Sequence, residues 1–393
     1  MTPDFHAAAE DLQEEMIARR RDFHRHPELG FQEVRTAGIV AKELNELGLE
    51  VQTGVGKTGV VGMLEGDEPG PTVLLRFDMD ALPIEEENST DYISTTSGVM
   101  HACGHDAHTT IGLGVAKMLT PYRYQLKGRL KFVFQPAEEG LGGARAMIAD
   151  GVLDNPVVEY ALGLHVWNDK PVGWVAASPG AVMAAVNSWK MIITGAGGHA
   201  ASPFQTRDPI VAAAQIVTAA QSIVARNIDA RESAVLSVST IHAGDATNII
   251  PSRVELSGTL RSYLPSIHEL VQRRFEQIAT GIAKAMDCDA ELEWLTAGEA
   301  VTNDADVACL VREVAGGIPG VTNVSSSERT MGSEDYGELM VDAPGCFFFV
   351  GSNNKEKELD FPHHHPRFDI DERVLTIGAA LMASSAARYV LLE

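Results

Sequence analysis

The chain has 393 residues, of which 45% are hydrophobic and 6% are aromatic, and its formal net charge is -23 at pH 7. This composition is typical of a globular enzyme or binding protein and excludes disordered and fibrous classes. The excess of acidic residues disfavours nucleic acid and anionic membrane surfaces as partners. Because the chain is longer than the size at which one hydrophobic core keeps growing, we expect two domains.

The N-terminus and the cysteines bear on localisation. The N-terminus has no basic start followed by an apolar stretch, so no secretory signal is predicted. No apolar run approaches the roughly 18 residues that a membrane span needs. The four cysteines show no CxxC spacing and lie far apart, at Cys103, Cys288, Cys309 and Cys346. We therefore expect a reduced, cytoplasmic protein with no membrane partner.

The first part of the chain alternates between helical and strand-like patterns. Residues 7–48 have helical apolar spacing that stops at Gly48, and residues 110–122 have the same spacing. Strand-like runs occupy 59–66, 71–82 and 128–140. This alternation predicts an α/β fold in which helices cover both faces of a sheet. In such sheets, ligand sites form where strands end.

Residues 184–297 form a self-contained pattern of strand, helix, two strands, helix and strand. This β-α-β-β-α-β order is typical of a ferredoxin-like α+β domain. We therefore predict a catalytic domain split between 1–183 and 298–393. The insert 184–297 is predicted to be a lid and dimerisation domain, because it offers edge strands and amphipathic helices. The α/β pattern resumes with a helix at 304–316, a strand at 346–352 and a helix at 372–391.

The run MHACGHDAH, residues 100–108, holds several side chains of the kinds that bind metals. Cys103 and His105 can reach one metal centre only from an irregular or extended backbone. Gly104, between them, allows such a turn. Taken alone, the run also fits a polar loop or a reactive-thiol site.

Further ligand-type side chains follow predicted strands. Glu138 and Glu139 lie in PAEEG after one strand, His165 follows another, and three histidines occupy 363–365. Singly, adjacent acids are more often solvated, and a lone histidine is more often hydrogen-bonded and half-buried. Because these groups follow strands, where α/β sites form, a shared site is the more economical interpretation. Together they exceed the needs of one tetrahedral ion, which indicates two ions.

The inserted segment contributes three further candidates. His199 lies on the glycine-rich turn GAGGHAASP, for which turn chemistry alone favours a plain hairpin loop. The functional alternative is a group that stabilises an oxyanion at the metal site. Asn248 and Arg261 lie in GDATNIIP and TLRSY, and a guanidinium is suited to binding a substrate carboxylate. Alone, each is more often a loop cap or a surface charge.

Taken in order, these runs resemble the co-catalytic metallopeptidase family that contains aminoacylase and glutamate carboxypeptidase. The similarity is greatest to its amidohydrolase branch, which includes hippurate hydrolase and the auxin-conjugate hydrolases. The matching runs span nearly the full chain: FHRHPELGFQE, RFDMDALPIEE, MHACGHDAHTTIGLG, FQPAEEG, GLHVWN, GGHAASP, ATNIIPSRVELSGTLR, MGSEDYG and HHHPRFDID.

The resemblance implies a set of metal ligands. Two divalent ions would be held by Cys103, His105, Glu139, His165 and His364, with Cys103 as the bridge. The branch usually places a histidine two positions before proline in its terminal motif, which selects His364, although His363 and His365 flank it. The mixed Cys/His/Glu set fits zinc, manganese, cobalt or nickel. The remaining polar members of the first run are interpreted as supporting or structural: His101, Asp106 and His108.

The resemblance also implies catalytic roles. Glu138 would take a proton from a metal-bridging water and later protonate the leaving amine. Asp80 would orient a metal ligand. His199 would polarise the scissile carbonyl, in this family often across a dimer, while Asn248 and Arg261 would position the substrate.

The expected activity is metal-dependent hydrolysis of the amide bond of N-acyl amino acids by a homodimer or higher homo-oligomer. The sequence leaves the acyl group open between acetyl, benzoyl and larger groups. A dipeptidase or carboxypeptidase that uses the same site is the alternative. A non-catalytic metal-binding relative or a Cys103 thiol sensor is a third hypothesis, which the acid pair beside a full ligand set argues against.

Overall fold

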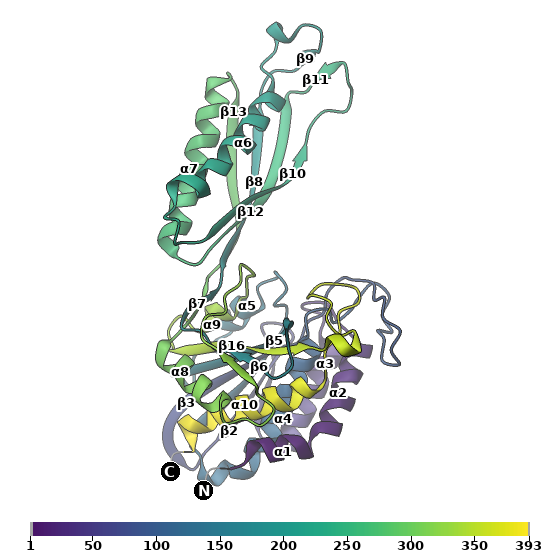
Figure 1. Ribbon diagram of the computed structural model, residues 1–393, viewed down its shortest axis with the longest axis vertical. Helices are drawn as coiled ribbons and strands as arrows, with labels where there is room; N and C mark the ends of the chain where they lie inside the picture. The colour runs from purple at the N-terminus through teal and green to yellow at the C-terminus, as the bar shows by residue number, and fades with distance from the viewer. Residues whose placement is uncertain (1–2, 392–393) are drawn as a thin grey trace. The chain divides into compact units, whose positions relative to one another are not determined.

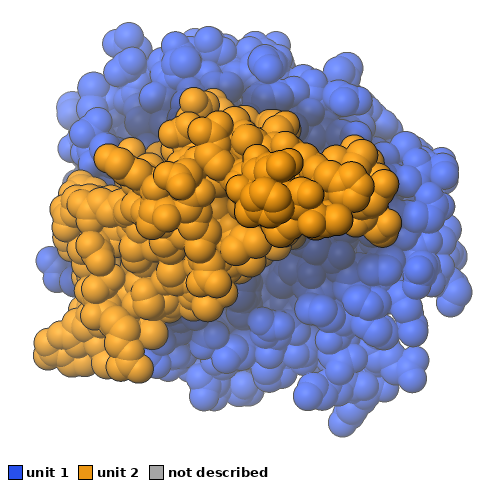
Figure 2. Space-filling model, turned by 90° about the horizontal axis from the view of Figure 1, so that it is seen from above, with its two compact units in different colours: residues 1–182, 302–329, 335–393 blue, residues 183–301, 330–334 orange. Residues whose placement is uncertain are grey.

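The computed structural model describes residues 3–391. The chain divides into two compact units, which Figure 2 shows in different colours. Unit 1 contains the residues up to Val182, Thr302–Arg329 and those from Asp335 onward, and unit 2 contains Met183–Val301 and Thr330–Glu334.

The segment Thr330–Glu334 lies outside the predicted insert, 184–297, but belongs to unit 2. The Gly332 carbonyl accepts a hydrogen bond from the Ala184 backbone N–H at 2.8 Å, and the Met331 carbonyl accepts one from Arg261 at 2.8 Å. Sequence spacing gives no sign of these contacts.

Unit 1 is built around an eight-stranded mixed sheet, which confirms the predicted α/β class (Figure 1). The strand order is β1-β2-β4-β3-β5-β16-β6-β15. Strands β4, β3, β5 and β16 run parallel to one another. Strand β2 pairs antiparallel with both β1 and β4, and β6 pairs antiparallel with β16. The strands are β1 (Glu50–Val55), β2 (Gly59–Glu65), β3 (Glu68–Asp78), β4 (Lys127–Gln135), β5 (Tyr160–Pro171), β6 (Trp174–Ala176), β15 (Asn323–Ser325) and β16 (Gly345–Asn353).

Helices cover both faces of this sheet. The helices of unit 1 are α1 (Phe5–Asp11), α2 (Gln13–Arg25), α3 (Val34–Glu46), α4 (His105–Leu119), α5 (Gly143–Ala149), α8 (Ala305–Ala315), α9 (Tyr336–Leu339) and α10 (Arg373–Val390). On β5, Gly163 packs against Tyr336 of α9, while Leu164 contacts Gly378 of α10. Because neighbouring strand residues point to opposite faces, α9 and α10 lie on opposite sides of the sheet. The central strand β16 is buried along its whole length, as expected for a strand covered on both faces.

The helix predicted at 110–122 begins earlier, at His105, and ends at Leu119. Its N-cap residue, Gly104, has the left-handed φ of 93°. A Cβ there would lie 2.3 Å from a Val166 methyl carbon, so only glycine fits. The helix therefore starts at the metal-ligand motif itself, and His105 occupies its first turn.

Unit 2 has the predicted β-α-β-β-α-β order. Its elements are β8 (Ala185–Thr194), α6 (Pro209–Asn227), β10 (Ala234–His242), β12 (Arg253–Ser262), α7 (Pro265–Ala285) and β13 (Asp289–Gly298). The antiparallel sheet has the order β10-β12-β8-β13, and α6 and α7 pack on it and on one another. Alternate residues of β8 and β12 are buried, so the helices cover one face. Short strands β7 (Gly180–Met183) and β14 (Val301–Asn303) pair where the chain passes between the units.

Helix α6 has the length and composition of a candidate membrane span, with 33% of its window buried. The expectation that no segment approaches this length therefore needs correction. The helix begins at Pro209, after Asp208 caps it, and it packs Ala212, Ile216 and Ile223 into the core of unit 2. Its high mean hydropathy comes from many alanines and from the one apolar face that packs on the sheet.

Candidate metal centre

The C-terminal end of β3 and the residues just after it carry three charged side chains. Arg76, Asp78 and Asp80 are two residues apart, and all three are buried. The Arg76 Nη1 donates to Asp78 Oδ2 at 2.7 Å, which compensates that carboxylate. Asp80 accepts from His105 Nδ1 through its Oδ1 at 3.1 Å and its backbone carbonyl at 2.9 Å. Since both acceptors require a hydrogen on Nδ1, the Nε2 of His105 is left for a further partner.

A tight loop after β4 presents the two predicted acids. Ala137 has a left-handed φ of 54°, and its N–H donates to the buried Glu33 carboxylate at 2.8 Å. A Cβ on Gly143 would lie 1.6 Å from the Pro136 carbonyl oxygen, so the loop requires glycine there. The Glu139 N–H donates to Asp80 Oδ2 at 3.0 Å. The same aspartate thus fixes both the His105 ring and the acid loop.

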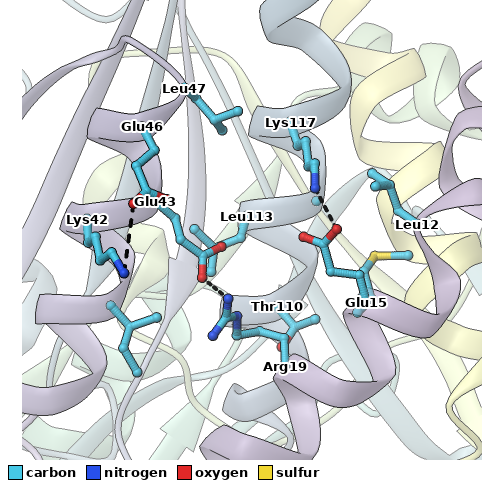
Figure 3. A pocket seen from close by; sticks show the side chains of 13 residues that line it. Leu12, Glu15, Arg19, Lys42, Glu43, Glu46, Leu47, Thr110, Leu113 and Lys117 are labelled. Carbon is cyan, nitrogen blue, oxygen red and sulfur yellow. Dashed lines mark hydrogen bonds and ion pairs between the residues drawn. The ribbon is translucent and has the colours of Figure 1, made fainter.

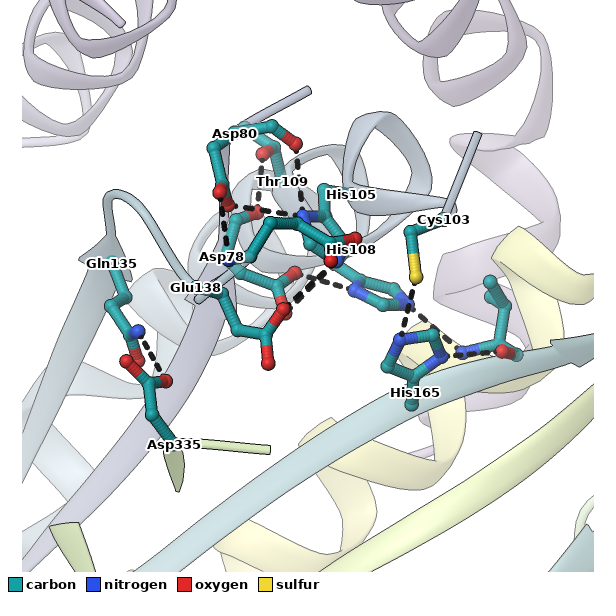
Figure 4. A network of polar contacts seen from close by, with 12 residues as sticks. Asp78, Asp80, Cys103, His105, His108, Thr109, Gln135, Glu138, His165 and Asp335 are labelled. Atoms are coloured by element: carbon teal, nitrogen blue, oxygen red, sulfur yellow. Dashed lines mark hydrogen bonds and ion pairs between the residues drawn. The ribbon is translucent and has the colours of Figure 1, made fainter. Parts of the chain in front are cut away.

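His165 lies in the middle of β5, rather than after a strand as the sequence predicted, and is 5% exposed. Its Nδ1–H donates to the Val166 carbonyl at 2.6 Å, so Nε2 carries the lone pair. That Nε2 lies 3.5 Å from Cys103 Sγ (Figure 4). Two predicted ligands from different elements therefore face one another.

The structure distinguishes the three histidines at 363–365. The Asn168 N–H donates to His363 Nε2 at 3.0 Å, so the hydrogen of that ring is on Nδ1, 3.9 Å from Cys103 Sγ. His365 Nδ1 accepts from the Arg367 N–H at 3.0 Å. His364 has a left-handed φ of 66°, and its Nε2 lies 3.2 Å from Glu139 Oε1. The geometry therefore favours His364, the histidine that the terminal motif selects.

The five predicted ligands converge in overlapping sets. Ligand atoms of Cys103, His105 and His165 lie within 4.8 Å of one another, as do those of Cys103, Glu139 and His364. Cys103 is common to both sets, as a bridging ligand would be. Glu138 Oε2 lies 4.0 Å from His105 Nε2 (Figure 4). The cluster contains the thiolate, imidazole and carboxylate donors that suit borderline divalent ions.

The electrostatics of the cluster fit cations. Burial lowers the pKa of His105, but Asp78 and Asp80 outweigh it and raise that pKa to about 10. Burial, and then the carboxylates of Glu139 and Glu138, hold the pKa of the Cys103 thiol well above its usual value. Both shifts report an acidic, dry site that favours positive charge. His105 Nε2 is buried and has no hydrogen-bond partner among residues 3–391, so a metal ion there would fill an unsatisfied position.

A second buried network lies behind the first turn of α4. Asp106 contacts Arg20 Nε at 2.8 Å and His24 Nδ1 at 2.7 Å. Asp369 accepts from Arg20 at 2.8 Å and from the Tyr92 hydroxyl at 2.7 Å. Burial and Arg20 lower the pKa of His24, but the carboxylates of Asp106 and Glu86 outweigh them and raise it to about 9. This network anchors α2 to the helix that carries His105.

The candidates in unit 2 form a separate group. His199 lies in β9 (Gly198–His199), which pairs antiparallel with β11 (Ile249–Ile250), and the Ala200 N–H donates to the Asn248 carbonyl at 3.0 Å. The exposed His199 accepts the Ala201 N–H on Nδ1 at 3.0 Å. Its neutral ring therefore carries the hydrogen on Nε2, which is a donor.

Arg261 lies at the other end of unit 2. The β12 register pairs Arg253 with Thr194, next to the ribbon of His199, whereas Arg261 pairs with Val186. Eight residues of extended strand correspond to about 26 Å. Arg261 is half-buried, and burial lowers its pKa. One copy of unit 2 therefore does not bring Arg261 together with His199 and Asn248.

A groove between α2, α3 and α4 lies outside these clusters (Figure 3). Its floor is apolar, with Met16 and Leu113. Its rim carries exposed or half-exposed ion pairs, which join Arg19 to Glu43, Lys42 to Glu46 and Lys117 to Glu15. The rim charges compensate one another, so the groove lacks the convergent donors and acids of the metal-ligand cluster.

Sequence reasoning missed three residues and undervalued a fourth. Asp78 and Arg76 were not singled out, although charged residues at alternate positions in a buried strand are a signal of a site. His108 was interpreted only as supporting, and it contacts Asp78 Oδ1 at 2.5 Å. Asp335 was also not singled out. Its carboxylate accepts from Gln135 Nε2, at the end of β4, at 2.6 Å (Figure 4).

The fold and the ligand cluster are those of a metallopeptidase-type hydrolase, and comparison with known proteins identifies the family. The model described as "Peptidase family M20/M25/M40" matches residues 74–388. The chain belongs to this family, which confirms the resemblance found in the sequence and the assignment as a hydrolase.

Three relatives match along nearly all of this chain and of their own. A putative amidohydrolase, YhaA, from Bacillus subtilis is 40% identical over 96% of this chain and 95% of its own. Thermostable carboxypeptidase 2 from Saccharolobus solfataricus is 37% identical over 96% of each chain. An N-acetylcysteine deacetylase from Bacillus subtilis is 38% identical over 94% of this chain and 96% of its own.

A solved structure supports the fold. The Bacillus subtilis YXEP protein, described as a dinuclear metal binding peptidase of the M20 family, superposes with a TM-score of 0.84 at 34% identity. The match covers 96% of this chain and 98% of that one.

Proposed function

We propose that this chain hydrolyses the amide bond of N-acyl amino acids and uses two divalent ions to do so. The observation that carries the proposal is the position of the Glu138 carboxylate, 4.0 Å from the unsatisfied His105 Nε2 within a cluster of thiol, imidazole and acid groups. A binding module has no use for a second acid at that place. Relatives named as an amidohydrolase and an N-acetylcysteine deacetylase support the same reaction class.

The proposed ligands are the five side chains that converge: Cys103, His105, Glu139, His165 and His364. When bound, the ions would polarise the scissile carbonyl and lower the pKa of a bound water to about 7. Asp80 holds the His105 ring with its Nε2 toward the site, as carboxylate partners of metal-binding histidines commonly do. Zinc, manganese, cobalt and nickel all fit this donor set.

Glu138 is the proposed general base and acid. Its carboxylate takes the proton of the attacking water and returns it to the leaving amine, so the amino acid departs as a free amine. The loop fixed by Glu33 and Asp80 holds the backbone around Glu138 and Glu139. In this loop, the Glu139 carboxylate lies beside His364 and the Glu138 carboxylate lies beside His105.

His199 is the proposed oxyanion donor. The Ala201 N–H occupies its Nδ1, so the ring offers Nε2–H without being protonated. A donor of this kind stabilises the tetrahedral oxyanion. Asn248, beside it on the same ribbon, and Arg261 are the proposed substrate-binding residues, with the Arg261 guanidinium directed at the substrate carboxylate.

The separation of His199 and Asn248 from Arg261 by nearly the length of β12 supports a homodimer in which His199 serves the other copy's site. The exposed edge strand β10 gives such a dimer a pairing surface. Mixing tests this proposal. Refolded mixtures of Glu138→Gln and His199→Gln chains should recover about one quarter of wild-type activity, because one site in each heterodimer keeps both groups. If His199 acts within its own chain, the mixture stays inactive.

The substrate test compares N-acetyl and N-benzoyl amino acids with dipeptides and C-terminal peptides, each with zinc, manganese, cobalt and nickel. We expect the acyl-amino acids to give the highest kcat/KM. The relative named as a carboxypeptidase makes peptide hydrolysis the alternative, and faster turnover of peptides would establish it. We propose a cytoplasmic location, since the four cysteines are free, as expected for a reducing compartment.

A further inference from the structure

His108 is a buried histidine whose two ring nitrogens are both used. It lies on α4, one turn after His105, and has no exposed surface. Its Nδ1 lies 2.5 Å from Asp78 Oδ1, and its Nε2 accepts the Val166 backbone N–H at 2.9 Å. Figure 4 shows His108 beside Asp78, His105 and His165.

These two contacts fix the state of the ring. A backbone N–H can only donate, so His108 Nε2 holds a lone pair and the ring hydrogen is on Nδ1, where it donates to Asp78. Ligand atoms of Asp78, His105 and His108 also lie within 4.8 Å of one another. His108 has no lone pair left for an ion, so this set is not a third metal site.

The backbone of Val166 connects His108 to His165. Its N–H is held by His108, while its carbonyl accepts from His165 Nδ1 at 2.6 Å. The second bond places the lone pair of His165 on Nε2, which faces Cys103 Sγ at 3.5 Å. The ladder between β3 and β5 ends at Arg76 and Gly163. Beyond that point, β3 no longer offers an acceptor to β5, and His108 Nε2 accepts the Val166 N–H instead.

On the other side, Asp78 connects His108 to His105 and to the strand. The Asp78 Oδ2 accepts from Arg76 Nη1 at 2.7 Å and lies 3.6 Å from His105 Nε2. The His108 ring thus contacts both Asp78, which lies near His105, and Val166, which follows His165.

We propose that His108 is a positioning residue for the metal centre: its imidazole, oriented by Asp78 at Nδ1, holds the Val166 N–H at Nε2 so that His165 presents its own Nε2 to the ions. This inference rests on the proposed role of His165 as a ligand. Partners that orient metal-binding histidines typically change metal affinity by about 10–100-fold when they are replaced.

Two substitutions separate the contacts of His108. In His108→Gln, the side-chain oxygen lies near the position of Nε2 and can accept the Val166 N–H. In His108→Asn, the amide lies near the position of Nδ1 and can donate to Asp78, but nothing reaches Val166. His101→Gln is the matched control, since His101 is equally buried in the same motif and has no hydrogen-bond partner among residues 3–391.

The measurement is the dissociation constant of Co²⁺ in competition with a chelator, together with the visible spectrum, which reports the geometry around the ion. We expect His108→Asn to raise the dissociation constant of one of the two Co²⁺ ions by about 10–100-fold and to alter the spectrum. His108→Gln and His101→Gln should both remain close to wild type. Wild-type affinity in His108→Asn, or equal loss in all three variants, overturns the proposal. Absence of Co²⁺ binding by the wild-type chain instead overturns the proposed function.

A second measurement does not depend on the folding of variants. Long-range ¹H–¹⁵N correlations in the metal-free wild-type protein identify the tautomer of each histidine ring. We expect His108 to carry its hydrogen on Nδ1 and to leave Nε2 unprotonated. A hydrogen on Nε2 contradicts the assignment.

Discussion

The metal-ligand cluster of unit 1 and the His199 ribbon of unit 2 provide chemistry in opposite ways. In the cluster, His105 and His165 are buried, and each ring is fixed by a hydrogen bond on Nδ1. On the ribbon, His199 is exposed and is held by one local bond from Ala201. Buried hydrogen bonds thus preorganise the ligands before any ion arrives, whereas the ribbon presents a donor that acts only where a substrate meets it. Substitutions in the two regions should therefore fail in different ways.

The largest effect is expected for Glu138→Gln. Removal of the general base and acid should lower kcat by about 10²–10⁴-fold, while the metal content of the protein stays at two ions per chain. Steady-state kinetics with metal analysis of the same sample measures both. Retained activity rules out Glu138 as the base, and lost metal shows that it is a ligand.

His199→Gln is expected to lower kcat by about 10²–10³-fold, because an oxyanion donor acts in the transition state. Metal affinity and thermal stability should not change, since His199 is exposed and lies outside the cluster. His6→Gln, at a histidine of α1 outside the metal-ligand cluster and the β10 edge, is the control and should keep wild-type kcat. If His199→Gln instead raises KM alone, its role is in substrate binding.

His24 tests the buried network of unit 1 through pH. Its pKa is raised from 6.5 to about 9, so protonated His24 stabilises the folded state fully below pH 6.5, and this contribution is lost as the pH rises toward 9. The difference in unfolding free energy between wild type and His24→Gln should shrink over that window by as much as about 3 kcal/mol. Urea titrations across the window measure it, and a pH-independent difference contradicts a charged His24.

The smallest effect is expected at the groove between α2, α3 and α4. Lys117 and Glu15 are 42% and 52% exposed, and exposed ion pairs contribute about 0–1 kcal/mol. Lys117→Ala should leave kcat and KM unchanged and lower the unfolding free energy by less than about 1 kcal/mol. A changed KM would indicate that substrate reaches this groove.

The sequence predicted the elements whose patterns are local. The apolar runs of β3 and β16, the β-α-β-β-α-β order of unit 2 and the crowding in residues 100–108 all follow from residue spacing. The approach of Cys103 to His363, 260 positions apart, depends on folding. The sequence indicated only that the histidines at 363–365 share a site with Cys103, and resemblance selected His364 among them. The start of α4 at His105 was missed because Gly104 is fixed by contact with Val166, which no local pattern shows.

The roles of Asp78 and His108 lie beyond the sequence for a related reason. Which nitrogen of a histidine carries the hydrogen depends on its partners, and those of His108 come from β3 and β5. The choice of His364 over its neighbours likewise depends on the backbone bonds of Asn168 and Arg367.

The most direct test of the central claim is hydrolysis of N-acyl amino acids by the wild-type chain before and after removal of metal. Chelation should abolish turnover, and two equivalents of a divalent ion per chain should restore it. Turnover that survives chelation and is blocked by alkylation of Cys103 would contradict the account and establish a thiol mechanism.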